Sequence, residues 1–330
     1  MYGPAQIAGY LALVVTPAAL FVGAVRAPTD PSTGLLSVQL GVVLAGTVVA
    51  AMECHRLWTV ETAGWEFDAT GFDRTDAVDA LAVPAAAVLT YGLSVHADLG
   101  PVLASALVGL IVGLGLPRID GAAYCGSFVG MASPAVFPSL EGVALAGLLA
   151  GLAFVATAES FGGFGGKYGT IALFGCLSAV FLTDVDYAAG SSLEWRLAPV
   201  IGAVAVVAAV ATVLLRTRGE TSSVVASAAV GVVAGVGFPR ILPELGPTLA
   251  AVAFCASFVG MSSAERLETT GQVAGAGLVC GLVYLAVAPA LAGAGGKLGT
   301  TAFVSCLALA GALELTAVAR SSVGRFAVSR

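Results

Sequence analysis

The sequence predicts an all-α, polytopic integral membrane protein with about twelve transmembrane segments. Hydrophobic residues make up 58% of the chain and charged residues only 10%, whereas soluble domains carry about 25% charged residues. The mean hydropathy is +0.98. In addition, three motifs each occur twice, which indicates that most of the chain is an internal duplication.

Apolar stretches long enough to cross a membrane follow one another along the chain. A helix needs about 20 mostly apolar residues to cross the hydrocarbon layer. Residues 5–25 and 35–53 form the first two such stretches. The others are residues 77–96, 99–117, 121–138, 141–161, 166–183, 197–216, 223–240, 246–263, 270–291 and 297–318. Between the second and third stretches, His55 to Asp76 form either a helix at the membrane interface or a solvated loop.

The repeated motifs define two units. GLIVGLGLPRI at 109–119 resembles GVVAGVGFPRI at 231–241, with an offset of 122 residues. CGSFVGMAS at 125–133 resembles CASFVGMSS at 255–263, and GGKYGT at 165–170 resembles GGKLGT at 295–300, both with an offset of 130. Eight extra residues within 242–252 explain the difference. The expected regions are 1–76 (two additional helices and a loop), 77–183 (first unit), 184–196 (acidic linker), 197–318 (second unit) and 319–330 (basic tail).

The number of crossings per unit decides the relative orientation of the units. Five helices in each unit would insert the second copy upside down, giving the 5+5 inverted repeat found in many secondary transporters. The distribution of Lys and Arg then places both termini in the cytoplasm of a multi-pass cell-membrane protein. The third segment contains Gly126, Gly130, Pro134 and Pro138, which also fits a broken or re-entrant helix. If it does not cross, the two copies are parallel.

The GGK turns are the first candidate site. Each opens a helix, whose free N–H groups and dipole favour an anion, and each carries one of the two lysines in the chain. The alternative is a tight turn whose lysine extends to the lipid headgroups. The inverted topology predicts that the turns lie at opposite membrane faces and attract or gate the solute. The candidate residues are Gly166, Lys167, Thr170, Gly296, Lys297 and Thr300.

The repeated Cys-x-Ser-Phe-Val-Gly-Met-x-Ser element is the second candidate. A helix interrupted there would expose polar backbone that lines a midplane binding site. A packing seam of small residues is the alternative, and the GxxxG pairs Gly147/Gly151 and Gly277/Gly281 predict such seams elsewhere. The candidate residues of the repeated element are Ser127, Gly130, Ser133, Ser257, Gly260 and Ser263.

Ionisable residues near the apolar stretches are a third class of candidate. Glu159 lies shortly before the first GGK turn, and we expect it to pair with Lys167 and carry a coupling proton. Asp79, Asp184 and Glu314 are further candidates, and a charge at a helix end is the alternative for all four. Cys125, Cys176, Cys255 and Cys306 occupy paired positions, but burial as small side chains is favoured over a metal site.

These patterns predict a transporter for a small polar or anionic solute that works by alternating access. The alternatives are a channel with a static pore and a membrane subunit or sensor that transports nothing. No catalytic motif is present, so we expect no enzyme activity and no metal or cofactor. The net charge of −6 argues against nucleic-acid binding. The expected partners are membrane lipid, the solute and, in a homo-oligomer, further copies of the chain.

Overall fold

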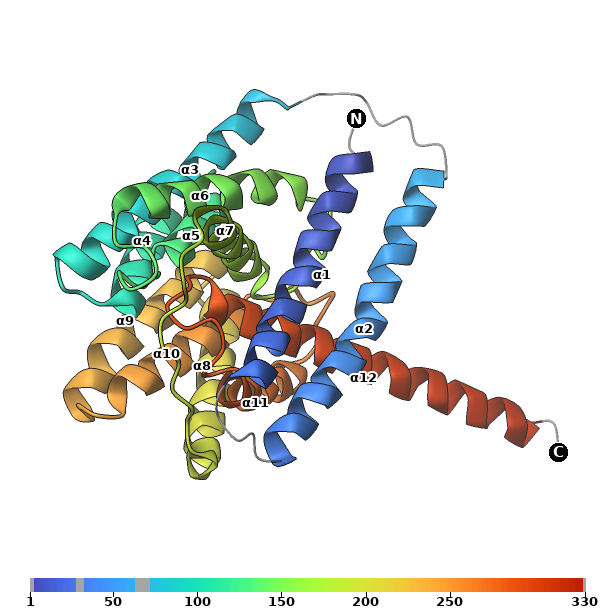
Figure 1. Ribbon diagram of the computed structural model, residues 1–330. Coiled ribbons are helices and arrows are strands. Elements are labelled where there is room, and N and C mark those ends of the chain that lie inside the picture. The colour runs from blue at the N-terminus through green and yellow to red at the C-terminus, as the bar shows by residue number, and fades with distance from the viewer. Residues whose placement is uncertain (1–2, 28–32, 63–71, 329–330) are drawn as a thin grey trace.

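The computed structural model describes residues 3–27, 33–62 and 72–328, and all regular secondary structure in these ranges is helical (Figure 1). The prediction of an all-α fold is confirmed. The helices are α1 (Gly3–Arg26), α2 (Thr33–Thr62), α3 (Arg74–Tyr91), α4 (Pro101–Gly115), α5 (Asp120–Val129), α6 (Leu140–Ala156), α7 (Lys167–Thr183), α8 (Ala198–Arg218), α9 (Ser223–Ile241), α10 (Gly246–Val259), α11 (Thr270–Ala286) and α12 (Lys297–Val328), with a π-turn η1 (Gly92–His96) and a 3₁₀ turn η2 (Trp195–Leu197).

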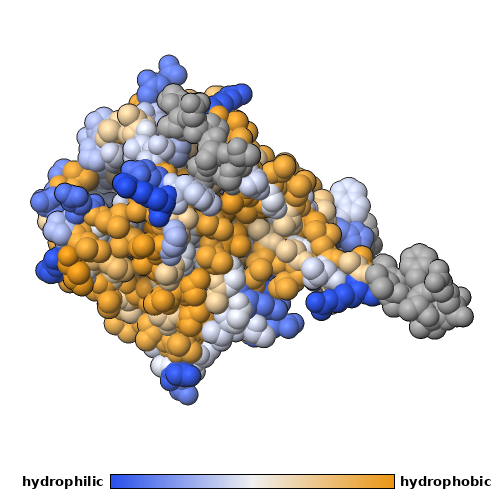
Figure 2. Space-filling view, turned by 90° about the horizontal axis from the view of Figure 1, so that it is seen from below, coloured by the Kyte–Doolittle hydropathy of each residue, from blue (hydrophilic) through white to orange (hydrophobic). Residues whose placement is uncertain are grey.

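Within the described ranges, six helices are long and apolar enough to cross a membrane, which indicates an integral membrane protein. They cover residues 4–26, 36–59, 74–96, 195–218, 223–241 and 297–320. Large aliphatic side chains are exposed on their surfaces, including Val207 on α8 and Val233 on α9. Seen from below, a broad hydrophobic area covers the molecule, with hydrophilic residues gathered mainly at its borders (Figure 2).

The third predicted segment of each unit is an interrupted helix. α5 has 10 residues, which span about 15 Å at 1.5 Å per residue, half the thickness of the hydrocarbon layer. It ends at Val129 with Gly130 as its C-cap, and turns precede α6. α10 ends at the corresponding place, with Gly260 as its C-cap.

The two additional N-terminal helices pack against the ends of both units. α1 contacts the end of α6, since a Cβ placed on Gly9 would lie 2.2 Å from the carbonyl oxygen of Ala156. α2 crosses α12, where Gly311 meets the carbonyl oxygen of Ala45. α2 continues to Thr62 and therefore includes the first part of the predicted interfacial segment; residues 63–71 of that segment lie outside the described residues. α12 likewise continues through the predicted tail as far as Val328.

Small residues bring the helices of each unit close together. A Cβ on Gly151 of α6 would lie 2.3 Å from the carbonyl oxygen of Ala80 on α3. In the second unit, a Cβ on Gly281 of α11 would lie 3.2 Å from Cα of Gly202 on α8. These contacts confirm that the GxxxG pairs are packing seams, which let helix backbones approach closely in lipid.

Candidate functional site: the two GGK turns and the Glu53 cluster

The two GGK turns meet in the interior of the molecule. A Cβ placed on Gly169 would lie 2.4 Å from Cα of Gly299, and one on Gly299 would lie 2.5 Å from Cα of Gly169. Both glycines are buried. α7 and α12 therefore start side by side, and only glycine permits the contact. The expectation that the turns lie at opposite membrane faces does not hold. α6 and α11 end at Ala156 and Ala286, five residues before the predicted ends, and the following loops return to the centre.

Each turn has the same left-handed start. Gly166 and Gly296 both have φ of 83°, a conformation that glycine adopts without a steric penalty. A Cβ on Gly166 would meet the carbonyl oxygen of Gly299, and one on Gly296 would meet that of Gly169. The contacts between the turns are thus reciprocal, as in an interface with twofold symmetry.

The first backbone N–H groups of both helices find no acceptor in the part of the chain that the structure describes. Gly166 provides no side-chain cap for α7, and the first N–H with an acceptor in its first turn is that of Thr170, which donates to the Gly166 carbonyl. The N–H groups of residues 167–169 and 297–299 have no hydrogen-bond acceptor among the described residues. Two helix N-termini with free donors, each the positive end of a helix dipole, therefore converge at this point.

The two lysines turn back toward the ends of the preceding helices. Lys167 Nζ donates to the carbonyl oxygens of Thr157 at 2.6 Å and Ala158 at 3.2 Å. Lys297 Nζ donates to those of Ala288 at 2.6 Å and Ala290 at 2.7 Å. Each ammonium group satisfies carbonyls at the negative end of a helix dipole, where a cation is stabilised. Each lysine thereby fixes its loop and keeps a positive charge beside the converging helix starts.

The two threonines of the turns are buried and bonded within their own turns. Thr170 Oγ1 lies 3.4 Å from the carbonyl oxygen of Gly166, and Thr300 Oγ1 lies 3.2 Å from that of Gly296. Both residues are fully buried. Their hydroxyl groups thus secure the first helical turn.

The Cys-x-Ser-Phe-Val-Gly-Met-x-Ser elements form the packed centre of the protein. Ser127 Oγ bonds to Ser105 Oγ at 2.9 Å, and Ser257 Oγ bonds to Ser227 Oγ at 2.8 Å. Gly130 and Gly260 lie against the backbones of α3 and α8, where an added Cβ would come within 2.4 and 2.5 Å of carbonyl oxygens. Aromatic rings fill the space between α5 and α10; these are Tyr124, Phe128, Phe254 and Phe258. This arrangement is a closely packed seam of small and aromatic residues.

The last serine of each element holds the loop before the opposite GGK turn. The N–H of Ser133 donates to the carbonyl oxygen of Gly293, and the N–H of Ser263 donates to that of Gly163, both at 2.8 Å. The two bonds are equivalent in the repeat, because the donors Ser133 and Ser263 are 130 residues apart and so are the acceptors Gly163 and Gly293. The structure therefore brings residues 133 and 263 to the GGK loops, whereas Ser127 and Ser257 remain in the central seam.

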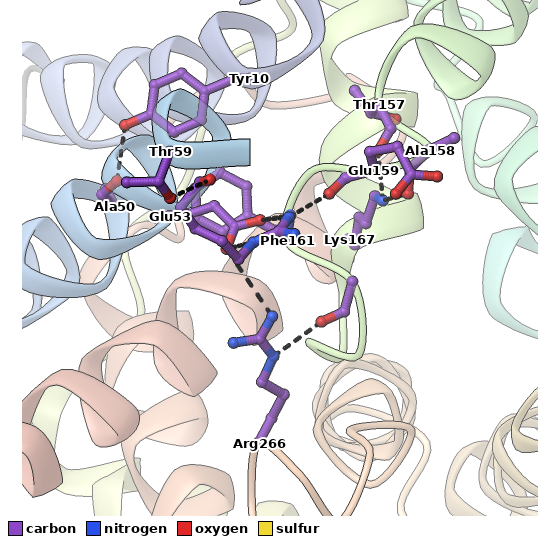
Figure 3. Close-up of polar contacts among 12 residues, drawn as sticks. Tyr10, Ala50, Glu53, Thr59, Thr157, Ala158, Glu159, Phe161, Lys167 and Arg266 are labelled. Atoms are coloured by element: carbon purple, nitrogen blue, oxygen red, sulfur yellow. Dashed lines mark hydrogen bonds and ion pairs between the residues drawn. The ribbon is translucent and has the colours of Figure 1, made fainter. Parts of the chain in front are cut away.

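A buried carboxylate that the sequence analysis missed, Glu53, connects three elements. Its side chain is 4% exposed, and it accepts hydrogen bonds from Arg56 Nη2 at 2.7 Å and from the N–H of Phe161 at 2.6 Å. Arg266 Nη2 lies 3.9 Å from its other oxygen. Figure 3 shows Glu53 between Phe161 and Arg266, with Lys167 on the far side of the same loop. The signal in the sequence was an acid inside an apolar stretch with an arginine three residues later.

Arg56 and Arg266 complete this Glu53 cluster. Arg56 Nη2 also donates to the carbonyl oxygen of Glu159 at 2.6 Å, and Arg266 Nε donates to that of Gly162 at 2.9 Å. The guanidinium of Arg266 lies 4.5 Å from the centre of the Phe164 ring, in cation–π geometry. The loop before the first GGK turn is therefore held by α2 and by the second unit at once.

A polar cavity of about 240 Å³ opens beside the cluster. It is lined by Val49, Met52, Glu53, Arg56, Phe164, Glu265, Arg266, Ala310 and Glu314. Two arginines and three acids make it mixed in charge. Of the acids named from the sequence, Glu314 lies in this lining, whereas the side chain of Glu159 is exposed and only its carbonyl is bonded. No ion pair between Glu159 and Lys167 occurs in the described part of the chain.

The loop before the second GGK turn has apolar surroundings instead. With the offset of 130 residues, Leu291 is the counterpart of Phe161, and Val136 is the counterpart of Arg266. The linker covers this loop, because the N–H of Ala188 donates to the carbonyl oxygen of Ala292 at 3.0 Å. Burial raises the pKa of Tyr187 in the linker to about 12, so its phenol is neutral at physiological pH. Within the described ranges, the charged cluster lies beside the first GGK turn and has no counterpart beside the second.

The cysteines do not form a multidentate metal site in the described residues. No group of three or more His, Cys, Asp or Glu side chains gathers there. Cys125 and Cys255 donate to the carbonyl oxygens of Tyr168 and Leu298, which ties each repeated element to the adjacent GGK turn. Cys125, Cys176, Cys255, Cys280 and Cys306 are buried, and Cys54 is exposed.

A scan against protein-family models finds no match for this chain, and neither a curated protein nor a solved structure matches it.

Proposed function

We propose that the protein is a membrane transporter for a small anionic solute, built as an inverted repeat and working by alternating access. The observation that carries this proposal is the meeting of two helix N-termini with free N–H groups, each beside a partly buried lysine. Discontinuous helices of secondary transporters bind anionic groups with such N-termini. The helix interruptions after Val129 and Val259 support the same architecture.

The helix lengths support descent of the two units from one ancestor. α9 has 19 residues where α4 has 15, and α10 has 14 where α5 has 10. The four extra residues of α10, 246–249, lie within the expected insertion, whereas the end of α9 corresponds to residues 116–119 of the first unit, which follow α4. The reciprocal contacts between the GGK turns add a local twofold relation, which an inverted repeat requires when its axis lies in the membrane plane.

The orientation of the units is testable by cysteine labelling. Arg118→Cys and Arg240→Cys, each introduced with Cys54→Ser, should react with a membrane-impermeant maleimide from opposite sides of the membrane. The five buried cysteines provide a low background. The readout is labelling in right-side-out and inside-out vesicles. Reaction of both positions from the same side would contradict the inverted repeat and favour parallel units.

The cavity beside the Glu53 cluster is the proposed path of the solute to the first GGK turn. Arg56 and Arg266 line the cavity as donors for an anion, and Glu53 holds both guanidinium groups in place, while three acids in the lining leave the cavity without a net positive charge. Beyond the loop 157–166 lie Lys167 and the free N–H groups of α7. The tight contact at Gly169 and Gly299 blocks this route, so the solute passes only when α7 and α12 move apart. The pairing of Glu53 with Arg56 and Arg266 favours its charged form, so Glu53 holds the loop rather than carrying a proton.

Removing the lysine charge should lower flux more than removing a surface charge. We expect Lys167→Met and Lys297→Met each to reduce anion uptake by proteoliposomes at least about tenfold, since a charge-assisted hydrogen bond contributes about 1.5–3 kcal/mol. Lys167→Arg should retain part of the flux because it keeps the charge and the donors. Uptake of chloride, sulfate, phosphate and acetate is measured per folded protein, with Arg118→Gln as the control. If wild type and both methionine variants transport equally, the lysines are not part of the anion route.

A further inference from the structure

The second unit has an apolar groove on its surface, outside the proposed transport route. The groove lies between α8 and α9, with Ala253 of α10 also in its lining, and its volume is about 1040 Å³. Val207 on α8 and Val233 and Ile241 on α9 line it and are 67%, 74% and 74% exposed. Gly237 adds room, because a Cβ placed on it would have nothing within 4 Å.

The groove has one charged side chain in its lining, Arg218, at the end of α8. Arg218 is exposed and has no hydrogen bond or ion pair to the described residues. Its neighbour Arg216 differs, because Arg216 Nη1 donates to the carbonyl oxygens of Met261 at 3.1 Å and Ser262 at 2.7 Å. Glu220 lies outside the lining. The groove thus combines a long apolar surface with one free cation at its end.

These dimensions fit a lipid. From Ala203 to Arg218 the helix rises about 22 Å at 1.5 Å per residue, which exceeds the roughly 15 Å depth of one leaflet's hydrocarbon. Both flanking helices are long and apolar enough to cross a membrane. A groove on their outer surface would be open to acyl chains along its length, and the guanidinium of Arg218 would stand at the level of the headgroups. Arginine binds phosphate through charge-assisted hydrogen bonds.

We propose that the groove between α8 and α9 binds the acyl chains of an anionic phospholipid, whose phosphate is held by Arg218. Large exposed apolar surfaces mark interaction sites, and the position of the single cation identifies this occupant as an amphiphile with an anionic head. A second copy of the chain would not need an unpaired arginine at one end of the groove. The bound lipid would stabilise the packing of α8 and α9 over α10.

Native mass spectrometry of the full chain tests this proposal. The detergent-purified protein is titrated with phosphatidylglycerol or phosphatidylcholine carrying the same acyl chains. Wild type should bind phosphatidylglycerol about tenfold more tightly, as expected for one charge-assisted contact. Arg218→Gln should abolish this preference. Val233→Trp should lower the binding of both lipids by filling the groove.

Two control variants distinguish the groove from general lipid binding. Ile111→Trp places the same side chain at the corresponding exposed position of α4, and Arg118→Gln removes a different exposed cation. Both should bind lipid like wild type. Equal affinity of wild type for the two lipids would overturn the proposal, and so would a loss in Ile111→Trp as large as that in Val233→Trp. A dimer that retains no lipid and dissociates in Val233→Trp would show that a second copy covers the groove.

Discussion

We expect Gly169→Ala to destabilise the protein by about 3 kcal/mol and to abolish anion flux. The new methyl group would lie 2.4 Å from Cα and 3.0 Å from the nitrogen of Gly299. These are backbone atoms, which cannot rotate away as a side chain would. α7 and α12 must therefore separate at the point where the two turns meet. The free N–H groups at the two helix starts then no longer lie close together.

Thermal unfolding in detergent measures this loss, with a thiol-reactive fluorophore that reports exposure of the buried cysteines. Gly41→Ala is the control, since a Cβ there would have nothing within 4 Å and alanine favours a helix. The double variant Gly169→Ala/Gly299→Ala should cost clearly less than the sum of the single variants, because both act on one contact. An unchanged unfolding temperature in Gly169→Ala would contradict the contact between the turns.

The second large effect concerns Glu53. We expect Glu53→Gln to destabilise the protein by about 2 kcal/mol, because it leaves Arg56 and Arg266 without their buried counter-charge. The shape of the side chain is kept, so the loss reports charge and hydrogen bonding. The loop 157–166 should loosen, since Glu53 also accepts the N–H of Phe161. Hydrogen exchange at this loop and thermal unfolding are the two measurements.

A solvent-exposed ion pair provides the matched control for Glu53. Glu194 pairs with Arg196, and their side chains are 64% and 76% exposed. Glu194→Gln should change stability by less than about 1 kcal/mol, as exposed pairs contribute little. Glu53→Gln/Arg56→Gln should recover part of the loss, because it removes one of the unpaired guanidinium groups. If Glu53→Gln is no more destabilising than Glu194→Gln, the cluster does not hold the loop.

The helices could be predicted well because local signals define them. The predicted stretch 166–183 corresponds to α7 at Lys167–Thr183, and 223–240 corresponds to α9 at Ser223–Ile241. Glycine pairs correctly indicated close helix packing. Gly130 and the prolines after it correctly indicated an interruption of the third segment. In each case the signal lies within a few residues of the feature that it predicts.

The arrangement at the candidate site depends on contacts between distant segments, which one sequence does not reveal. The meeting of Gly169 with Gly299 requires the loops after α6 and α11 to return to the interior, and hydropathy extends those helices five residues too far. Glu53 acquires its role from Phe161 and Arg266, which are 108 and 213 residues away. The lysines stood out in the sequence because the chain contains two of them at equivalent positions. Their carbonyl partners could not be predicted, because helix ends were uncertain by several residues.

Solute-induced current is the most direct test of the proposed transport mechanism. Proteoliposomes on a solid-supported membrane are exposed in turn to gradients of chloride, sulfate, phosphate and acetate. We predict a transient current that saturates with the concentration of at least one of these anions and is lost in Gly169→Ala but retained in Gly41→Ala. A steady, non-saturating conductance, or no current with any of the four anions, would contradict a transporter in which the anion passes between the GGK turns.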